Sequence, residues 1–175
     1  MNPMRKKSSN GFSLIELLIV VAIILIIAAI AIPNFLRSKI AANESSAAAS
    51  LRTITTAETT YASSWGSGYA VALDNLGGGA PCITASAATA CIIDSGLSVA
   101  PHQKSGYIFV AVGNNLVGGV YNGFEANATP SAVDLTGKRA FCADQTGVLR
   151  ANATGVAIGT GQGTCATVST LIVGN

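Results

Sequence analysis

The chain has 175 residues, a length that suits one domain, or one domain with an appendage. Half of its residues are apolar and 10% are charged, whereas about a quarter are charged in an ordinary soluble domain. The apolar content argues against a disordered chain, and the net charge of +2 argues against a basic nucleic-acid-binding protein. The single histidine, His102, leaves little material for histidine-based catalysis or metal binding.

The N-terminal segment joins a basic tag to a long apolar run. Three basic residues occupy positions 5–7, and no acid precedes the run. As a helix, residues 12–32 would be roughly 31 Å long, which matches the hydrocarbon thickness of a bilayer. Because every residue from 17 to 32 is apolar, this helix is not a half-exposed surface helix. The basic tag places the N-terminus on the cytoplasmic side, although Arg37 and Lys39 follow the run closely.

Three interpretations of this run compete. It is an uncleaved membrane anchor, or a secretory signal peptide with its A-x-A cleavage site at residues 29–31, or the retained helix of a protein cut earlier, at the polar residues 8–11. Against the signal peptide, the run exceeds the usual apolar core of about 7–15 residues. It also contains a carboxylate, Glu16.

An ordered set of residues favours the third interpretation. The basic residues 5–7, the sequence Gly-Phe-Ser-Leu-Ile-Glu-Leu at 11–17, the unbroken apolar run and Pro33 together resemble the N-terminus of a type IV prepilin. The resemblance covers about residues 5–60. Beyond that point the chain resembles the family only in its layout.

The resemblance implies a processing step and a role for Glu16. A prepilin peptidase would cut between Gly11 and Phe12, remove the leader peptide of residues 1–11, and methylate the new amine of Phe12. An ionisable group inside a membrane span costs roughly 2–3 kcal/mol or more and usually marks function, although a carboxylate near the helix end can also reach the interface. In the family, the carboxylate at the position of Glu16 pairs with the N-terminal ammonium of a neighbouring subunit and sets the register of assembly.

Pro33 has two interpretations. It either ends the apolar helix, or lies within a longer helix that it kinks by removing the hydrogen bond to the carbonyl of Ala29. By the resemblance, the segment before this proline, residues 25–32, loses helicity inside a filament. The sequence favours a continued helix, because residues 34–64 contain neither glycine nor proline.

An apolar stripe at helical spacing follows the proline and needs a partner surface, most simply a sheet. Its members are Ile40, Ala47, Leu51, Ile54 and Tyr61. A helical spine is therefore predicted over residues 12–61, of which residues 12–32 form the transmembrane part and the filament core.

Residues 62–175 predict a globular head in three parts. Glycine-rich loops occupy residues 62–106, β-like runs occupy 107–151, and a tail with one edge strand occupies 152–175. Strands are predicted at 107–112, 116–125, 139–143 and 147–151, with tight turns at 113–115 and 144–147 and a longer link at 127–137. The predicted fold class is α+β, with the long N-terminal helical spine packed on a roughly four-stranded antiparallel sheet, as in type IV pilins.

Four cysteines in an exported head suggest disulfides, and four cysteines allow three pairings. We favour the local pairing, with Cys82–Cys91 closing the loop region and Cys142–Cys165 tying the last hairpin to the tail. The resemblance supports it, because pilins commonly bracket the C-terminal part of the head with a disulfide. A metal site is the rival interpretation, but the chain has no C-x-x-C sequence and one histidine.

The sequence carries no catalytic or nucleotide-binding signature, so we expect a structural protein that uses no cofactor or metal. The resemblance implies a major pilin that waits in the inner membrane with a cytoplasmic N-terminus. It then polymerises with copies of itself into an extracellular pilus for adhesion, twitching motility or DNA uptake. Prepilin peptidase, an inner-membrane assembly platform and an assembly ATPase would be its partners, and the nearly neutral head predicts no nucleic-acid binding.

Three alternatives remain. A pseudopilin of a type II secretion system shares the same N-terminus, although the absence of an acidic D-x-D calcium loop disfavours it. A minor pilin would use its head to bind a target. A membrane-tethered enzyme is disfavoured because no catalytic constellation is present.

Overall fold

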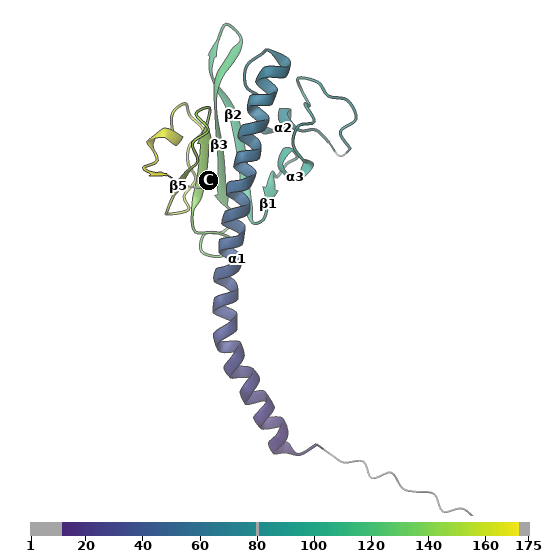
Figure 1. The fold of residues 1–175 in the computed structure, drawn as a ribbon, viewed down its shortest axis with the longest axis vertical. Helices are drawn as coiled ribbons and strands as arrows, with labels where there is room; N and C mark the ends of the chain where they lie inside the picture. Colours follow the sequence, from purple (N-terminus) through teal and green to yellow (C-terminus); the bar gives the residue numbers. More distant parts are fainter. Residues whose placement is uncertain (1–11, 80, 172–175) are drawn as a thin grey trace, which may run out of the picture. The chain divides into compact units, whose positions relative to one another are not determined.

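The computed structural model describes residues 12–79 and 81–171. It divides into two compact units, Met1–Arg37 and Ser38–Asn175, each of which is described by itself. Helix α1 (Leu14–Trp65) contributes its first part to one unit and its second part to the other (Figure 1).

In the first unit, the described residues form the apolar part of α1. Pro33 lies inside the helix and does not end it, so the interpretation of this residue as a helix terminator is wrong. Residues 25–32 are helical in this structure. The predicted continuous helix is confirmed, and it ends at Trp65, a few residues beyond the predicted spine.

In the second unit, the amphipathic part of α1 lies across an antiparallel sheet (Figure 1). The predicted stripe is buried at Ala47, Leu51, Ile54 and Tyr61. These side chains belong to one hydrophobic core with aromatic residues of the sheet, which are Tyr107, Phe109, Phe124 and Phe141. The helix is therefore held by its apolar face, as its spacing predicts.

The sheet has six strands in the order β1-β2-β3-β4-β5-β6, and every neighbouring pair is antiparallel. The strands are β1 (Gln103–Lys104), β2 (Tyr107–Val117), β3 (Val120–Pro130), β4 (Ala140–Asp144), β5 (Arg150–Asn152) and β6 (Thr170–Leu171). The four central strands correspond to the four predicted ones, and β1 and β6 add a two-residue strand at each edge. The α+β fold class is confirmed.

The first hairpin turn differs from the prediction. Residues 113–115 lie inside β2, and the chain turns at Gly118 and Gly119, whose φ angles are +60° and +85°. Positive φ at both central positions is the geometry of a tight hairpin turn that matches strand twist, and two glycines adopt it without steric cost. The second turn is as predicted, because the Gly147 N–H donates to the Asp144 carbonyl at 2.9 Å.

The predicted link at residues 127–137 is shorter than expected, because β3 continues to Pro130, which pairs with Tyr107. A proline is tolerated there because the ladder between β3 and β4 ends at Ala128, so Pro130 has a strand on one side only. The loop region contains two single-turn helices, α2 (Leu73–Leu76) and α3 (Ser95–Ser98). The tail contains a short 3-10 helix, η1 (Cys165–Thr167), before β6.

Candidate assembly segment and anchors of the head

The first part of α1 exposes apolar side chains all round the helix. Phe12 is 77% exposed, and large aliphatic side chains up to Leu36 are about half exposed or more. By length and composition, α1 is the one helix among the described residues that could cross a membrane. An apolar surface of this extent requires an apolar environment, which a bilayer or other helices can supply.

Glu16 lies in the first turn of α1, where the positive end of the helix dipole favours a carboxylate. Its Oε2 accepts a hydrogen bond of 2.9 Å from the backbone N–H of Ser13. This contact resembles one half of a capping box, in which an acid in the first turn bonds the N-cap N–H. Within one chain, Glu16 therefore stabilises the start of the helix, and its pairing with a neighbouring subunit remains a prediction.

Only one of the two residues at the predicted cleavage site lies within the described structure. Gly11 and the leader of residues 1–11 lie outside the described residues. Phe12 is described, and it precedes the first helical residue by two positions. Cleavage after Gly11, methylation of Phe12 and any loss of helicity before Pro33 in a filament therefore remain predictions.

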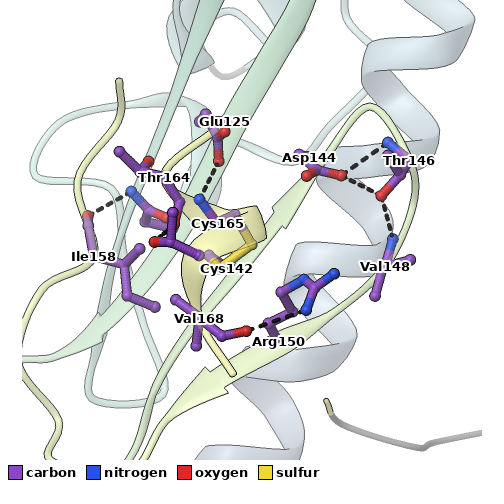
Figure 2. The surroundings of a disulfide bond; sticks show 12 residues. Glu125, Cys142, Asp144, Thr146, Val148, Arg150, Ile158, Thr164, Cys165 and Val168 are labelled. Atoms are coloured by element: carbon purple, nitrogen blue, oxygen red, sulfur yellow. Dashed lines mark hydrogen bonds between the residues drawn. A yellow bond between two sulfur atoms is a disulfide. The ribbon is translucent and has the colours of Figure 1, made fainter. Parts of the chain in front are cut away.

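Two disulfides join the four cysteines of the head. The structure pairs Cys142 with Cys165 and Cys82 with Cys91, the same local pairing that we favour from the sequence. Figure 2 shows the first of these bonds, which links β4 to the start of η1. Both of its cysteines are fully buried, so it ties the tail firmly to the sheet.

Glu125 provides a second attachment for the tail beside that disulfide (Figure 2). Its fully buried carboxylate accepts hydrogen bonds from the backbone N–H groups of Gly163 at 2.8 Å and Cys165 at 3.2 Å. Burial raises the pKa of Glu125 and the neighbouring Asp144 adds to this, while the bonds from the two N–H groups oppose it. The side chain is an anchor for the loop that the disulfide closes.

Glu44 anchors a different loop, the one between β3 and β4. Its Oε1 accepts hydrogen bonds from the backbone N–H groups of Lys138 and Arg139, at 2.9 and 3.1 Å. Its Oε2 accepts two more from the Arg139 guanidinium, at 2.9 and 2.7 Å. Burial alone raises the pKa of Glu44, but these bonds and the guanidinium charge outweigh it, so the pKa lies below its ordinary value.

Glu58 anchors the chain where it leaves α1. It is fully buried, and its Oε2 accepts a hydrogen bond of 2.8 Å from the Ala70 N–H. Burial raises the pKa of Glu58 to about 7, because this one bond offsets only part of the desolvation. Sequence reasoning missed the roles of all three glutamates, since each bonds residues between 12 and 95 positions away.

The His102 side chain is partly buried, although the residue follows a proline in a loop. Its Nδ1 lies 2.9 Å from the Leu97 carbonyl, and its Nε2 lies 3.1 Å from Asp74. It therefore ties α2 to α3 within the loop region. Among the described residues, no group of three or more histidine, cysteine, aspartate or glutamate side chains could hold a metal ion.

These features define a class of protein. One end of the chain is a helix with an uncovered apolar surface and a single carboxylate near its start, and the rest is an α+β head braced by disulfides and buried carboxylates. The arrangement is that of a subunit anchored, or packed with others, through its N-terminal helix.

Comparison with known proteins agrees with this class. A family model described as the prokaryotic N-terminal methylation motif matches residues 6–32. The type IV major pilin protein PilA of Myxococcus xanthus is 49% identical over 53 residues, which cover 30% of this chain and 24% of that protein. The match therefore spans about a quarter of the relative's length. No solved structure matches the chain.

The N-terminal matches and the α+β fold together support the resemblance of the chain to type IV pilins, in the broad sense that includes pseudopilins. Proteins of this family are structural and not catalytic. The resemblance seen in the sequence is thereby confirmed.

Proposed function

We propose that the chain is a major pilin, the principal subunit of a type IV pilus. The observation that carries the proposal is the first part of α1, whose apolar side chains are uncovered on every side. Over residues 12–37, Glu16 is the one acidic residue in this surface. The name of the Myxococcus xanthus relative as a major pilin supports the choice.

The apolar helix is compatible with two environments, the membrane before assembly and the filament core after it. Before assembly, lipid surrounds it in the inner membrane. After assembly, the helices of neighbouring copies surround it, and because lipid tails and helix side chains are equally apolar, the transfer costs little free energy. Direction and energy would come from an assembly platform and an assembly ATPase, since this chain carries no nucleotide-binding signature.

Glu16 would select the position of each incoming copy. After cleavage by prepilin peptidase, Phe12 carries an N-terminal ammonium four residues before this carboxylate. Glu16 of one copy can pair with the Phe12 ammonium of the next at one axial offset. A misplaced copy would leave a charge buried without a partner, at a cost of about 3–5 kcal/mol.

The test of export and processing is the N-terminal peptide of the protein in material sheared from the cell surface. We expect a dominant species that begins at N-methylated Phe12. A start at Ile32 would mean removal of an ordinary signal peptide, and intact chains confined to membranes would mean a simple anchored head. Either result would overturn the proposal, and a correctly processed but trace component would indicate a pseudopilin or minor pilin instead.

The test of assembly is Glu16→Ala, with Ile19→Ala as the matched control in the same apolar helix. We expect Glu16→Ala to insert into the membrane normally but to lower the filament yield at least about tenfold, because its neighbour's ammonium loses its partner. Ile19→Ala, which removes volume but no charge, should assemble. The readouts are membrane content and the amount of sheared filament. Abundant normal filaments from Glu16→Ala would rule out the register role.

A further inference from the structure

Glu58 is a buried acid at the junction between α1 and the segment that follows it, residues 66–72, which we name the latch segment. The side chain is fully buried within the head. Its Oε2 accepts the Ala70 N–H of the latch segment, while its Oε1 has no hydrogen-bond partner among the described residues. One oxygen of the carboxyl is thus satisfied and the other is not.

The latch segment is held on its other side by the β2–β3 hairpin. The Tyr69 N–H donates to the Tyr121 carbonyl at 2.9 Å, and the Gly113 N–H donates to the Val71 carbonyl at 3.1 Å. The approach is so close that a Cβ built on Gly113 would lie 2.5 Å from the Ala70 carbonyl oxygen. Whatever loosens the segment from α1 therefore also affects the hairpin.

Among the described residues, no positive charge compensates Glu58. None of the ion pairs of the described residues includes it. On the packed elements, the charged side chains are bonded elsewhere or exposed: Glu44 bonds Arg139, Glu125 bonds the tail, and Arg52 lies at the surface. The tyrosines on these elements are Tyr61, Tyr69, Tyr107 and Tyr121, of which Tyr61 donates to the Ala87 carbonyl and Tyr107 to the Arg139 carbonyl. Burial accordingly raises the pKa of Glu58 to about 7.

We propose that Glu58 is a pH-operated latch: its protonated carboxyl holds residues 66–72 against α1, and loss of the proton loosens this segment and the hairpin bonded to it. The ionised carboxylate has a single N–H partner in an apolar core, which is a costly environment for a charge. When the segment opens, water solvates the carboxylate and its pKa returns to the ordinary range. Docking is therefore strongest below pH 4.5, weakens as the pH rises toward about 7, and changes little above it.

The chain contains its own reporter of this site. Trp65, its single tryptophan, lies two turns after Glu58 on the same face of α1. The Trp65 indole N–H is buried and has no hydrogen-bond partner within the described part of the chain, and the centroid of its ring lies 6.2 Å from that of Tyr61. Opening of the latch segment would admit water to this indole and shift its fluorescence.

The test is hydrogen exchange of the full chain in detergent micelles across the pH range, with protection factors corrected for intrinsic exchange. For wild type we expect the opening constant of the latch segment to rise about 70-fold between about pH 5 and pH 8, because Glu58 releases one proton on opening in this range. Trp65 fluorescence should titrate over the same range. The control Glu44→Gln, which alters another buried carboxylate, should keep both responses.

Glu58→Gln keeps the acceptor oxygen for Ala70 but cannot ionise, so it should abolish the pH response at the latch segment. A pH response that persists in Glu58→Gln would overturn the proposal. Hydrogen exchange of the wild type alone also tests the proposal. A response confined to the latch segment and the hairpin supports the latch, whereas protection independent of pH, or lost equally over the whole head, refutes it.

Discussion

The head uses three buried glutamates to hold loops through their backbone N–H groups. Glu44, Glu58 and Glu125 each accept at least one such bond, yet their pKa values move in different directions. The directions differ because the Arg139 guanidinium stabilises the charged form of Glu44 and contacts neither of the other two carboxylates. A buried carboxylate with a cation stays charged at neutral pH and titrates only in acid, whereas burial without a cation raises the pKa.

The clamp at Glu44 can be tested by stability. Glu44→Ala removes four hydrogen bonds and should lower the free energy of unfolding by about 2 kcal/mol at neutral pH. Because the folded pKa lies below the ordinary 4.5, this stabilisation is present above that pH and is lost as the pH falls below it. The wild type should therefore converge with the variant in acid.

Urea unfolding at neutral and acidic pH is the measurement. The matched control is Lys138→Ala, which removes the long, exposed contact of Lys138 with Asp134 at 3.9 Å. Exposed pairs contribute about 0–1 kcal/mol, so this variant should stay close to wild type. Equal losses in the two variants would contradict the clamp.

Among the structural elements, the turn of the β2–β3 hairpin depends on the backbone conformation of its glycines and not on packing around them. A Cβ on Gly118 would meet nothing within 4 Å, so any cost of a side chain there comes from its φ of +60°. Residues other than glycine, asparagine and aspartate rarely adopt this conformation. The hairpin brings together the long strands that form the centre of the sheet.

Gly118→Ala should therefore destabilise the head by about 1 kcal/mol without any steric clash. Gly79→Ala is the matched control, because Gly79 has the same open surroundings and no positive φ. Thermal unfolding of both variants is the measurement. A Gly118→Ala protein as stable as wild type would show that the turn changes type to accommodate the side chain.

The Cys142–Cys165 bond closes the larger of the two disulfide loops, with a sequence separation of 23 against 9 for Cys82–Cys91. In the chain-entropy model, the larger loop contributes about 3 kcal/mol. Replacing Cys142 and Cys165 by alanine should lower the free energy of unfolding by that amount, and replacing the other pair should cost less. Urea denaturation of the two double variants measures both. A larger loss from the shorter loop would contradict the entropic account.

At the scale of the whole molecule, the described hydrophobic core lies within the unit Ser38–Asn175. Its buried apolar side chains run from Ala47 to Cys165, and none precedes Ala47. Removal of the first unit should therefore leave the core intact and remove the apolar surface that requires lipid. We expect the fragment of residues 38–175 to fold in water.

Circular dichroism and disulfide mapping of that fragment test this expectation. Its melting temperature should lie within about 5 °C of the full chain in detergent, since no core contact is lost. Both disulfides should form. A fragment that is unfolded or aggregated would show that the first part of α1 contributes to the stability of the head.

The sequence by itself determined the features that depend on neighbouring residues. The unbroken apolar run, the helical stripe from Ala47 to Tyr61 and the β-like runs of the four central strands are local patterns, and burial of the stripe follows its helical period. The motif around Glu16 also indicated the resemblance to type IV prepilins, because its residues are contiguous. These patterns were sufficient for the α+β fold.

Only the tertiary structure decided how distant residues meet. Glu44 reaches Arg139, Glu58 holds the latch segment, and Glu125 binds the tail, since the fold brings those backbone N–H groups to each carboxylate. It also showed why Gly113 lies inside β2 and not in the turn, because the Ala70 carbonyl approaches β2 there too closely for a side chain. A carboxylate's partner and a glycine's neighbour are properties of the folded chain, and no local spacing encodes them.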